Sequence, residues 1–413
     1  MMTTVSDRIQ ALAPSATLAM SQKSNELKAQ GVDVINLSVG EPDFNTPDHV
    51  KQAAHEAIDA NFSFYTPVPG YMSLRQAVCA KLKNENGLDF TPDQIVVGNG
   101  AKHALCNVIM ALVNPGDEVV IPTPAWVSYV QMVNLAGGEN VLVPATLDTC
   151  FKISPEQLEA AITPKTKLVI LCSPSNPTGS VYSRDELQAL AQVIARHEGV
   201  MVVADEIYEH INYVGRHESM AQFAEIKDRV IIINGVSKAY AMTGWRIGFS
   251  AAPQWISKGI NMLQGHYSSG PCSVSQMAAL AAWTQDWCKS DDGTEYQKSV
   301  EQMRLAFRRR RDLIVRLAKE IPGLEVNVPQ GAFYLFPKCS YYFGKKVVSG
   351  TWKGREIADS SDFAMFLLEQ AHVATVGGDA FGAAECFRMS YALSEDNIET
   401  ALARISEAVK LLQ

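Results

Sequence analysis

The chain has 413 residues, 47% of them hydrophobic, and its 36 basic and 44 acidic side chains give a formal net charge of −8 at pH 7. This length exceeds a single typical core, so we expect two domains. A pI near 5.6 gives no basic footprint for nucleic acid, and the sequence contains no apolar run of transmembrane length and no secretory signal, so we expect a cytoplasmic protein.

Apolar runs and helical patterns alternate along the first two thirds of the chain. The apolar runs predict strands at residues 94–98, 118–121, 140–144, 168–171, 201–204, 230–234 and 246–251. Helical patterns lie between most of them, at residues 101–113, 126–136, 184–197 and 275–287. This alternation predicts an α/β architecture, and we place a large domain at about residues 47–290.

The remaining residues, 1–46 and 291–413, are assigned to a second, smaller domain. Its pattern predicts a helix at 300–318, strands at 325–328, 331–336 and 387–391, and a closing helix at 395–412. The arginine run at 308–311 indicates a solvated helix face or an interface. Residues 338–355, rich in Lys, Gly and Tyr without a clean period, predict a loop insertion.

Cysteine and histidine spacing argues against disulfides and metal sites. The eight cysteines are scattered without paired spacing, which favours reduced thiols. The histidines are also dispersed, and His103 and His210 lie beside motif residues without metal-ligand companions. We therefore expect no bound metal and interpret both histidines as packing or supporting groups.

Lys238 is the first candidate for chemistry. It follows the strand predicted at 230–234, in a stretch broken into tight loops by Gly235, Gly244 and Gly248. A lysine just past a core strand and flanked by small residues can reach into a cleft, where its amine can form the Schiff base that pyridoxal phosphate requires. The ordinary alternative is a surface lysine on a loop.

Three motifs upstream support the cleft. Asn176 lies in a turn rich in Pro and Gly, where its amide could hold a phenolic oxygen. Asp205 and Tyr208 follow a buried strand, where a carboxylate can keep a pyridine nitrogen protonated and a phenol can share a proton with a ring oxygen. The glycine turn at 98–100 opens a helix whose amides can bind phosphate. Each motif is weak alone, since strand-end acids are often caps, but their joint order is far more specific.

In this order the motifs resemble the class I, fold-type I aminotransferases that depend on pyridoxal phosphate, and most closely the bacterial aspartate aminotransferase branch called subgroup I-gamma. The resemblance covers nearly the whole chain, from residues 14–17 to residues 388–392. It implies a large α/β/α domain with a mostly parallel sheet, a smaller α+β domain, and pyridoxal phosphate as the cofactor.

The resemblance also implies roles for single residues at the cofactor. Lys238 matches the Schiff-base lysine, Asp205 the acid at the pyridine nitrogen, Asn176 and Tyr208 the partners of the ring oxygen, and Trp126 the stacking aromatic residue. On the phosphate side, Gly100, Ala101 and Lys102 match the helix start, Arg246 matches the phosphate-binding arginine, and Ser237 stands beside Lys238 in the cofactor-binding motif. Tyr65 matches a tyrosine that reaches the phosphate from a neighbouring subunit, which implies a homodimer.

At the substrate, Gly40 and Arg388 match the backbone position and the arginine that bind the amino acid and its α-carboxylate, with Trp126 and Asn176 nearby. Lys102 and Thr17 occupy the positions that read a distal carboxylate in this branch. Ordinary alternatives remain: Trp126 in the core, Tyr65 in the aromatic cluster 62–65, Arg246 paired with a surface acid, and Lys102 facing solvent. Arg388 lies in an apolar stretch, where a buried charge needs an anion.

These roles predict an aspartate aminotransferase that follows ping-pong kinetics between L-aspartate and 2-oxoglutarate. An aspartate/prephenate or an aromatic, broad-range aminotransferase is the alternative; prephenate-competent relatives often carry a long polar or basic residue where this chain has Ala13. The same fold also hosts lyases and regulatory modules that bind the cofactor without turnover. A module of that kind would be expected to lose Lys238 or Asp205, and both are present.

Overall fold

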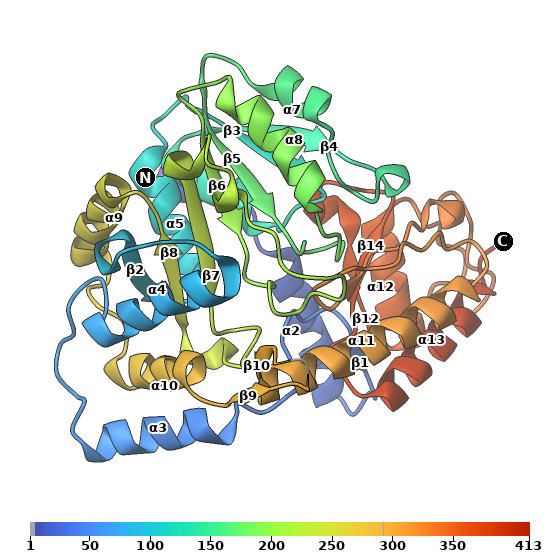
Figure 1. Ribbon diagram of the computed structural model, residues 1–413. Helices are drawn as coiled ribbons and strands as arrows, with labels where there is room; N and C mark the ends of the chain where they lie inside the picture. The colour runs from blue at the N-terminus through green and yellow to red at the C-terminus, as the bar shows by residue number, and fades with distance from the viewer. Residues whose placement is uncertain (1–4, 292) are drawn as a thin grey trace.

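The computed structural model describes residues 5–291 and 293–413. Its centre is a seven-stranded sheet with the strand order β2-β8-β7-β6-β5-β3-β4 (Figure 1). The strands are β2 (Ile95–Asn99), β3 (Glu118–Thr123), β4 (Glu139–Pro144), β5 (Thr166–Cys172), β6 (Met201–Asp205), β7 (Val230–Gly235) and β8 (Ile247–Ala251). Only β8 runs antiparallel to its neighbours within this sheet. The mostly parallel sheet of the predicted fold is therefore confirmed.

Helices cover both faces of this sheet because its strands are apolar on both sides. Alternate residues of one strand point to opposite faces, so Val119 packs in one core cluster and Val120 in the other. One face carries α5 (Ala101–Leu112), α6 (Ser128–Ala136) and α9 (Gln254–Tyr267). The other carries α3 (Asp48–Asp59), α4 (Met72–Asn86), α7 (Pro155–Ala161), α8 (Arg184–Ala195) and α10 (Ser273–Thr284).

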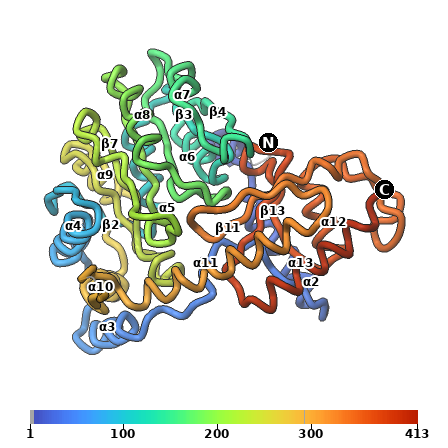
Figure 2. The backbone as a smooth tube through the Cα atoms, turned by 45° about the vertical axis from the view of Figure 1, so that its right-hand side comes forward, coloured from blue at the N-terminus to red at the C-terminus, as the bar shows by residue number. Residues whose placement is uncertain are grey.

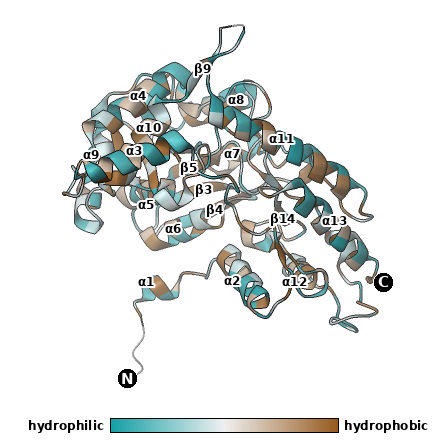
Figure 3. Cartoon of the chain, turned by 90° about the horizontal axis from the view of Figure 1, so that it is seen from below, coloured by the Kyte–Doolittle hydropathy of each residue, from teal (hydrophilic) through white to brown (hydrophobic). Residues whose placement is uncertain are grey.

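A second core lies to the right of the sheet in Figure 1. It contains the three-stranded antiparallel sheet β11-β14-β13, made of β11 (Tyr334–Leu335), β14 (Phe387–Ser390) and β13 (Val376–Gly377). A parallel pair, β1 (Ile35–Asn36) with β12 (Val373–Ala374), ties the N-terminal segment to it. The helices here are α2 (Ala16–Ala29), α12 (Ser360–Ala371) and α13 (Glu395–Val409). Short α1 (Asp7–Gln10) precedes α2 and lies near α6 instead (Figure 3).

The long helix α11 (Lys298–Lys319) connects the two parts, as Figure 2 shows. Its Val300 belongs to the core under the large sheet, whereas Met303 and Phe307 belong to the second core. The hairpin of β9 (Trp287–Lys289) and β10 (Glu295–Gln297) precedes it. The predicted domain boundaries at residues 46/47 and 290/291 stay a prediction. In the structure, the chain passes from the core under the large sheet to the second core within α11.

Two predicted strands differ from the structure. The predicted strand 325–328 is wrong, because only Glu325 forms an isolated bridge, to Lys338. The segment turns instead toward the large sheet, where the Asn327 side chain donates to the Thr178 carbonyl and Pro329 lacks the N–H that a strand needs. The predicted strand 331–336 shortens to β11.

The arginine run on α11 is only partly a solvated face. Arg310 forms a two-pronged ion pair with Asp43, 2.7 and 3.0 Å long, and Arg311 donates to the Pro329 carbonyl. The predicted loop at 338–355 packs its Val347 and Trp352 against the second core. Both segments therefore hold the second part of the molecule together.

Candidate active site

A cavity of about 370 Å³ opens where the carboxyl ends of β5, β6 and β7 meet the second part of the molecule. Ligands of open α/β sheets bind at this edge. Its walls come from both parts and from the N-terminal segment. Except for Gly100 and Tyr65, the predicted site residues all line it: Thr17, Gly40, Ala101, Lys102, Trp126, Asn176, Asp205, Tyr208, Ser237, Lys238, Arg246 and Arg388.

Lys238 lies three residues beyond the end of β7, and its Nζ donates to the Gly40 carbonyl at 2.5 Å. Burial lowers the pKa of this amine to about 8; the nearby Glu41 opposes the shift and Arg388 adds to it. An ammonium that loses its hydration shell without gaining a close carboxylate is easier to deprotonate. The amine is therefore a usable nucleophile and base near neutral pH.

Asp205 ends β6 with a fully enclosed carboxyl group. The Tyr129 hydroxyl donates to it at 2.6 Å and the Ile207 amide donates at 3.3 Å. Burial raises the pKa of Asp205 to about 6, and the hydrogen bond from Tyr129 restrains that rise. No arginine or lysine among the described residues forms an ion pair with it. A buried carboxylate in this state is suited to a cationic ring nitrogen.

Tyr129 was not predicted from the sequence, although a signal existed. It lies three residues after Trp126, and the two rings meet edge to face at 5.5 Å. On a helix that spacing places two side chains on one face. Trp126 itself lines the cavity rather than filling the core, so the stacking position assigned to it is available.

Arg388, on β14, is a buried guanidinium, 2% exposed. It donates to Asn176 Oδ1 at 2.9 Å and to the Ser38 carbonyl at 2.6 Å, while its Nε has no partner within the described chain. Its hydrogen bonds go to neutral oxygens, and none of the ion pairs formed by the described residues includes it. Since a buried charge without a counterion is costly, the position calls for an external carboxylate.

The start of α5 forms a recess in the cavity wall, next to Arg246. Gly100 has a φ of 84° there, and a Cβ on it would lie 2.5 Å from an Nη of Arg246. A Cβ on Gly248 would meet the Ala101 nitrogen at 2.2 Å, so both glycines keep the recess open. Among the described residues, Arg246 donates to the carbonyls of Thr243 and Asn99, at 2.8 and 3.2 Å, and forms no ion pair. Free helical N–H groups and an arginine without an acidic partner form a site for phosphate.

Two aromatic hydroxyls meet deep in the cavity. The Tyr208 and Tyr334 oxygens are 2.7 Å apart, and either can be the donor. Tyr334, on β11, was missed because its strand pattern looks like ordinary core sequence. Asn176 lies close by and accepts from Arg388.

Lys102 and Thr17 face the outer part of the cavity. Lys102 Nζ lies 4.8 Å from the Trp126 ring centroid, and burial, followed by repulsion from Arg246, lowers the pKa of the amine. Thr17 comes from α2, where its neighbour Leu18 is 70% exposed while also lining the cavity.

Tyr65, a predicted site residue, does not line the cavity of its own chain. It is 99% exposed, in a loop that also carries the exposed Phe64. The alternative of a buried phenol in the aromatic cluster is wrong. Its predicted contact with a neighbouring subunit stays a prediction.

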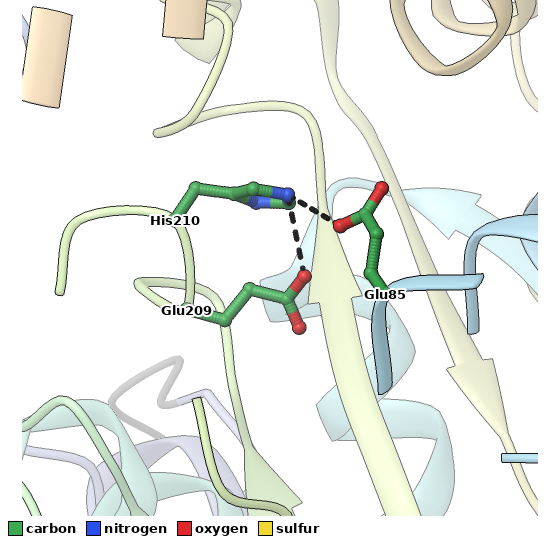
Figure 4. A group of neighbouring side chains, drawn as sticks. All are labelled: Glu85, Glu209 and His210. Atoms are coloured by element: carbon green, nitrogen blue, oxygen red, sulfur yellow. Dashed lines mark hydrogen bonds and ion pairs between the residues drawn. The ribbon is translucent and has the colours of Figure 1, made fainter. Parts of the chain in front are cut away.

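His210 has companions that its sequence context did not reveal. Figure 4 shows Glu85 and Glu209 pointing toward its ring, with His210 Nε2 2.7 Å from one carboxylate and 3.5 Å from the other. The expectation that this histidine stands without possible metal ligands is therefore wrong, since α4 supplies Glu85 across the fold. Lys81 ion-pairs with the buried Glu209 and lies 3.6 Å from the half-buried Glu85, so it supplies positive charge to both acids. His103 instead accepts from the Asn99 amide at 3.0 Å.

No helix in the described ranges is both long and apolar enough to cross a membrane. The model of the family described as aminotransferase class I and II matches residues 32–405. A probable aspartate/prephenate aminotransferase of Rhizobium leguminosarum bv. phaseoli is 46% identical over 97% of both chains. An aspartate aminotransferase of Geobacillus stearothermophilus is 46% identical over 96% of this chain and 97% of that one. Among solved structures, the aspartate aminotransferase of Rhizobium meliloti superposes with a TM-score of 0.93 at 42% identity, covering 100% of both chains.

Proposed function

The chain belongs to the aminotransferase class I and II family, and we propose that it transfers the amino group of L-aspartate to 2-oxoglutarate, giving oxaloacetate and L-glutamate. One observation carries the choice of substrate. Arg388 and Lys102 line the same cavity, and neither has a carboxylate partner among the described residues. Two cations at different depths match a substrate with two carboxylates.

The residues present fit pyridoxal phosphate, the cofactor of this family. When bound, it supplies an aldehyde that can link to a lysine and a ring that can accept electrons from the substrate α-carbon. The recess at Gly100 and Arg246 would hold its phosphate, and Asp205 would hold its ring nitrogen. Asn176 and Tyr208 would face the ring oxygen, Trp126 would cover the ring face, and Ala101, Lys102 and Ser237 would complete the walls.

The protein's own groups divide the work of proton transfer and binding. Lys238 Nζ is neutral in a useful fraction near pH 7. It would hold the cofactor through its aldehyde carbon and would serve as the base for the substrate α-proton. Asp205 would stabilise a positive charge on the ring nitrogen, and Arg388 would fix the α-carboxylate. Because donor and acceptor share these contacts, one site serves both half-reactions, and ping-pong kinetics follow.

We extend the proposal to a homodimer in the cytoplasm. Tyr65 is 99% exposed and lies beside Phe64, whose side chain is also largely exposed. Two exposed aromatic side chains together form an unusual surface unless another subunit covers them. A symmetric two-fold pair is the commonest closed assembly. All eight cysteines are free thiols, which agrees with a reducing compartment.

A second candidate is use of prephenate or aromatic amino acids. The exposed and apolar Leu18 supports it, because this side chain forms one wall of the cavity. A relative named as a probable aspartate/prephenate aminotransferase also supports it. Ala13, where a longer polar residue would favour prephenate, argues the other way.

The test is a panel of amino donors with 2-oxoglutarate, applied to the native enzyme and to Lys102→Ala. Loss of one charge-assisted contact should lower kcat/KM for aspartate by roughly ten- to a hundredfold. Alanine and phenylalanine, which lack a distal carboxylate, should be nearly unaffected. Pyridoxal phosphate affinity, measured in parallel, controls for damage to the phosphate recess. Equal losses for aspartate and phenylalanine would instead favour a broad-range aminotransferase in which Lys102 serves the cofactor. Keto acid release without any amino acceptor would indicate a lyase.

A further inference from the structure

Tyr334 occupies the point where three parts of the cavity wall meet. It is 1% exposed and sits on β11, opposite Ser390 in β14. Its hydroxyl lies 2.7 Å from that of Tyr208, which belongs to the loop after β6. A Cβ added to Gly40, in the N-terminal segment, would lie 2.3 Å from the same hydroxyl. Gly40 thus leaves the space in which the two phenols meet.

Either hydroxyl of this pair can donate to the other. The proposed function of Tyr208 fixes the direction, because a Tyr208 proton that points to the cofactor's ring oxygen leaves Tyr334 as the donor to the Tyr208 oxygen. Tyr208 then keeps its own proton for a third group in the cavity, and accepting a hydrogen bond strengthens it as a donor.

The Tyr334 ring has a separate contact. The guanidinium of Arg388 lies 4.6 Å from its centroid and 4.9 Å from that of Phe381. Two aromatic faces therefore stabilise a cation that has no carboxylate partner in the described structure. Since this contact uses the ring and the other uses the hydroxyl, substitution can separate them.

We propose that Tyr334 is a positioning residue with two independent functions: its hydroxyl orients and strengthens Tyr208 as a donor to the cofactor's ring oxygen, and its ring holds Arg388 ready for the substrate carboxylate. The inference rests on the proposed functions of Tyr208 and Arg388.

The hydroxyl is tested with Tyr334→Phe in the holoenzyme, following the pH midpoint of the visible absorption of the cofactor linked to Lys238. The midpoint should move in the same direction as in Tyr208→Phe, by a smaller amount of about 0.3–1 pH unit. In a Tyr208→Phe background the second substitution should add nothing. Tyr391→Phe is the matched control, because it removes a buried hydroxyl that bonds the Ala332 carbonyl outside the cavity, and it should leave the midpoint unchanged.

The outcomes distinguish the function of Tyr334 from the proposed function of Tyr208. If Tyr208→Phe shifts the midpoint and Tyr334→Phe does not, or if Tyr334→Phe shifts it equally in both backgrounds, the positioning inference is overturned while the proposed site stands. If Tyr208→Phe itself causes no shift, the proposed contact of Tyr208 fails first.

The ring is tested by the dissociation constant of maleate, an unreactive dicarboxylate, with KM values for aspartate and alanine. Tyr334→Phe should bind maleate within about twofold of the native enzyme, whereas Tyr334→Leu should weaken it by about 2- to 30-fold. Both KM values should rise together in Tyr334→Leu, since Arg388 reads a carboxylate common to all amino acids. Unchanged maleate binding in a folded Tyr334→Leu, or weakened binding in Tyr334→Phe, would overturn this half. Should Tyr334→Leu not fold, Tyr334→Met replaces it, since this substitution also removes the ring while keeping an apolar side chain of similar length, and the same outcomes decide.

Discussion

The ionisation of Lys238 gives the most direct test of the electrostatics of the site. With a pKa of about 8, caused by burial and increased by Arg388, roughly a quarter of the amine is neutral at pH 7.5. An ordinary lysine with a pKa of 10.5 would be neutral to only about one part in a thousand. The buried geometry therefore raises the reactive fraction on the order of two hundredfold.

The assay labels cofactor-free protein with a small amine-selective reagent between pH 6 and pH 10, and follows the Lys238 peptide by mass spectrometry. The labelling midpoint should lie near pH 8. Lys81 is an internal comparison, because burial lowers its pKa too, but Glu209 and Glu85 more than offset this and the pKa ends above its usual value. Lys81 should remain unlabelled until strongly alkaline pH.

Two charge variants test the sign of these electrostatic effects on the pKa of Lys238. Glu41 raises the pKa of Lys238, so Glu41→Gln should move the labelling midpoint below that of the native protein. Arg388→Gln removes a cation that lowers the pKa, and should move the midpoint upward. A native midpoint near 10.5, or an upward move in Glu41→Gln, would show that burial and these two charges do not control the amine.

Three further predictions address the cofactor site and the assembly. Asp205 has a folded pKa of about 6 against 3.8 when unperturbed, so the ionised carboxylate lowers folding stability. In denaturant unfolding, Asp205→Asn should therefore stabilise the cofactor-free protein at pH 7.5 by up to ~3 kcal/mol and lose that advantage toward pH 4. The same substitution should abolish most turnover. Gly100→Ala, with a Cβ forced against Arg246 at a positive φ, should weaken binding of pyridoxal phosphate at least tenfold by fluorescence titration, and unchanged affinity would place the phosphate elsewhere. Mixed dimers of Tyr65→Phe and Lys238→Ala chains should regain one native site, and absence of rescue in the activity assay would count against sharing of the site between subunits.

Much of the fold and most of the site could be predicted because the informative residues stand at strand ends. The strands β5, β6 and β7 are short apolar runs. Asp205 at the end of β6, and Asn176 and Lys238 shortly after β5 and β7, meet at one sheet edge by the geometry of parallel strands. Arg388 could be recognised because a charge inside an apolar strand demands a partner. The order of these residues along the sequence was therefore enough to predict that they share one site.

What was missed depends on contacts between distant segments. Tyr334 looks like one more apolar strand residue, and only the approach of Tyr208 and Gly40 gives its hydroxyl a function. Glu85 and His210 are 125 positions apart, so spacing rules for metal ligands could not relate them. The segment 325–328 has a strand pattern, yet it turns toward Thr178 because side-chain hydrogen bonds and Pro329 compete with sheet pairing.

Arg388 has no carboxylate partner among the described residues, and this restricts which substitutions the cavity walls can accept during evolution. A mutation that placed an aspartate or glutamate on a facing wall would neutralise the guanidinium and stabilise the empty fold. That carboxylate would also act as a tethered competitor, since a group held by the chain has an effective concentration in the millimolar range or above. Of the described residues that line the walls, two are acids, Glu41 and Asp205, although the chain as a whole has 44. Acidic residues that are added to raise the thermostability of this enzyme should therefore be placed outside the cavity walls. An acidic residue in the walls would stabilise the protein but would also occupy Arg388 and inhibit substrate binding.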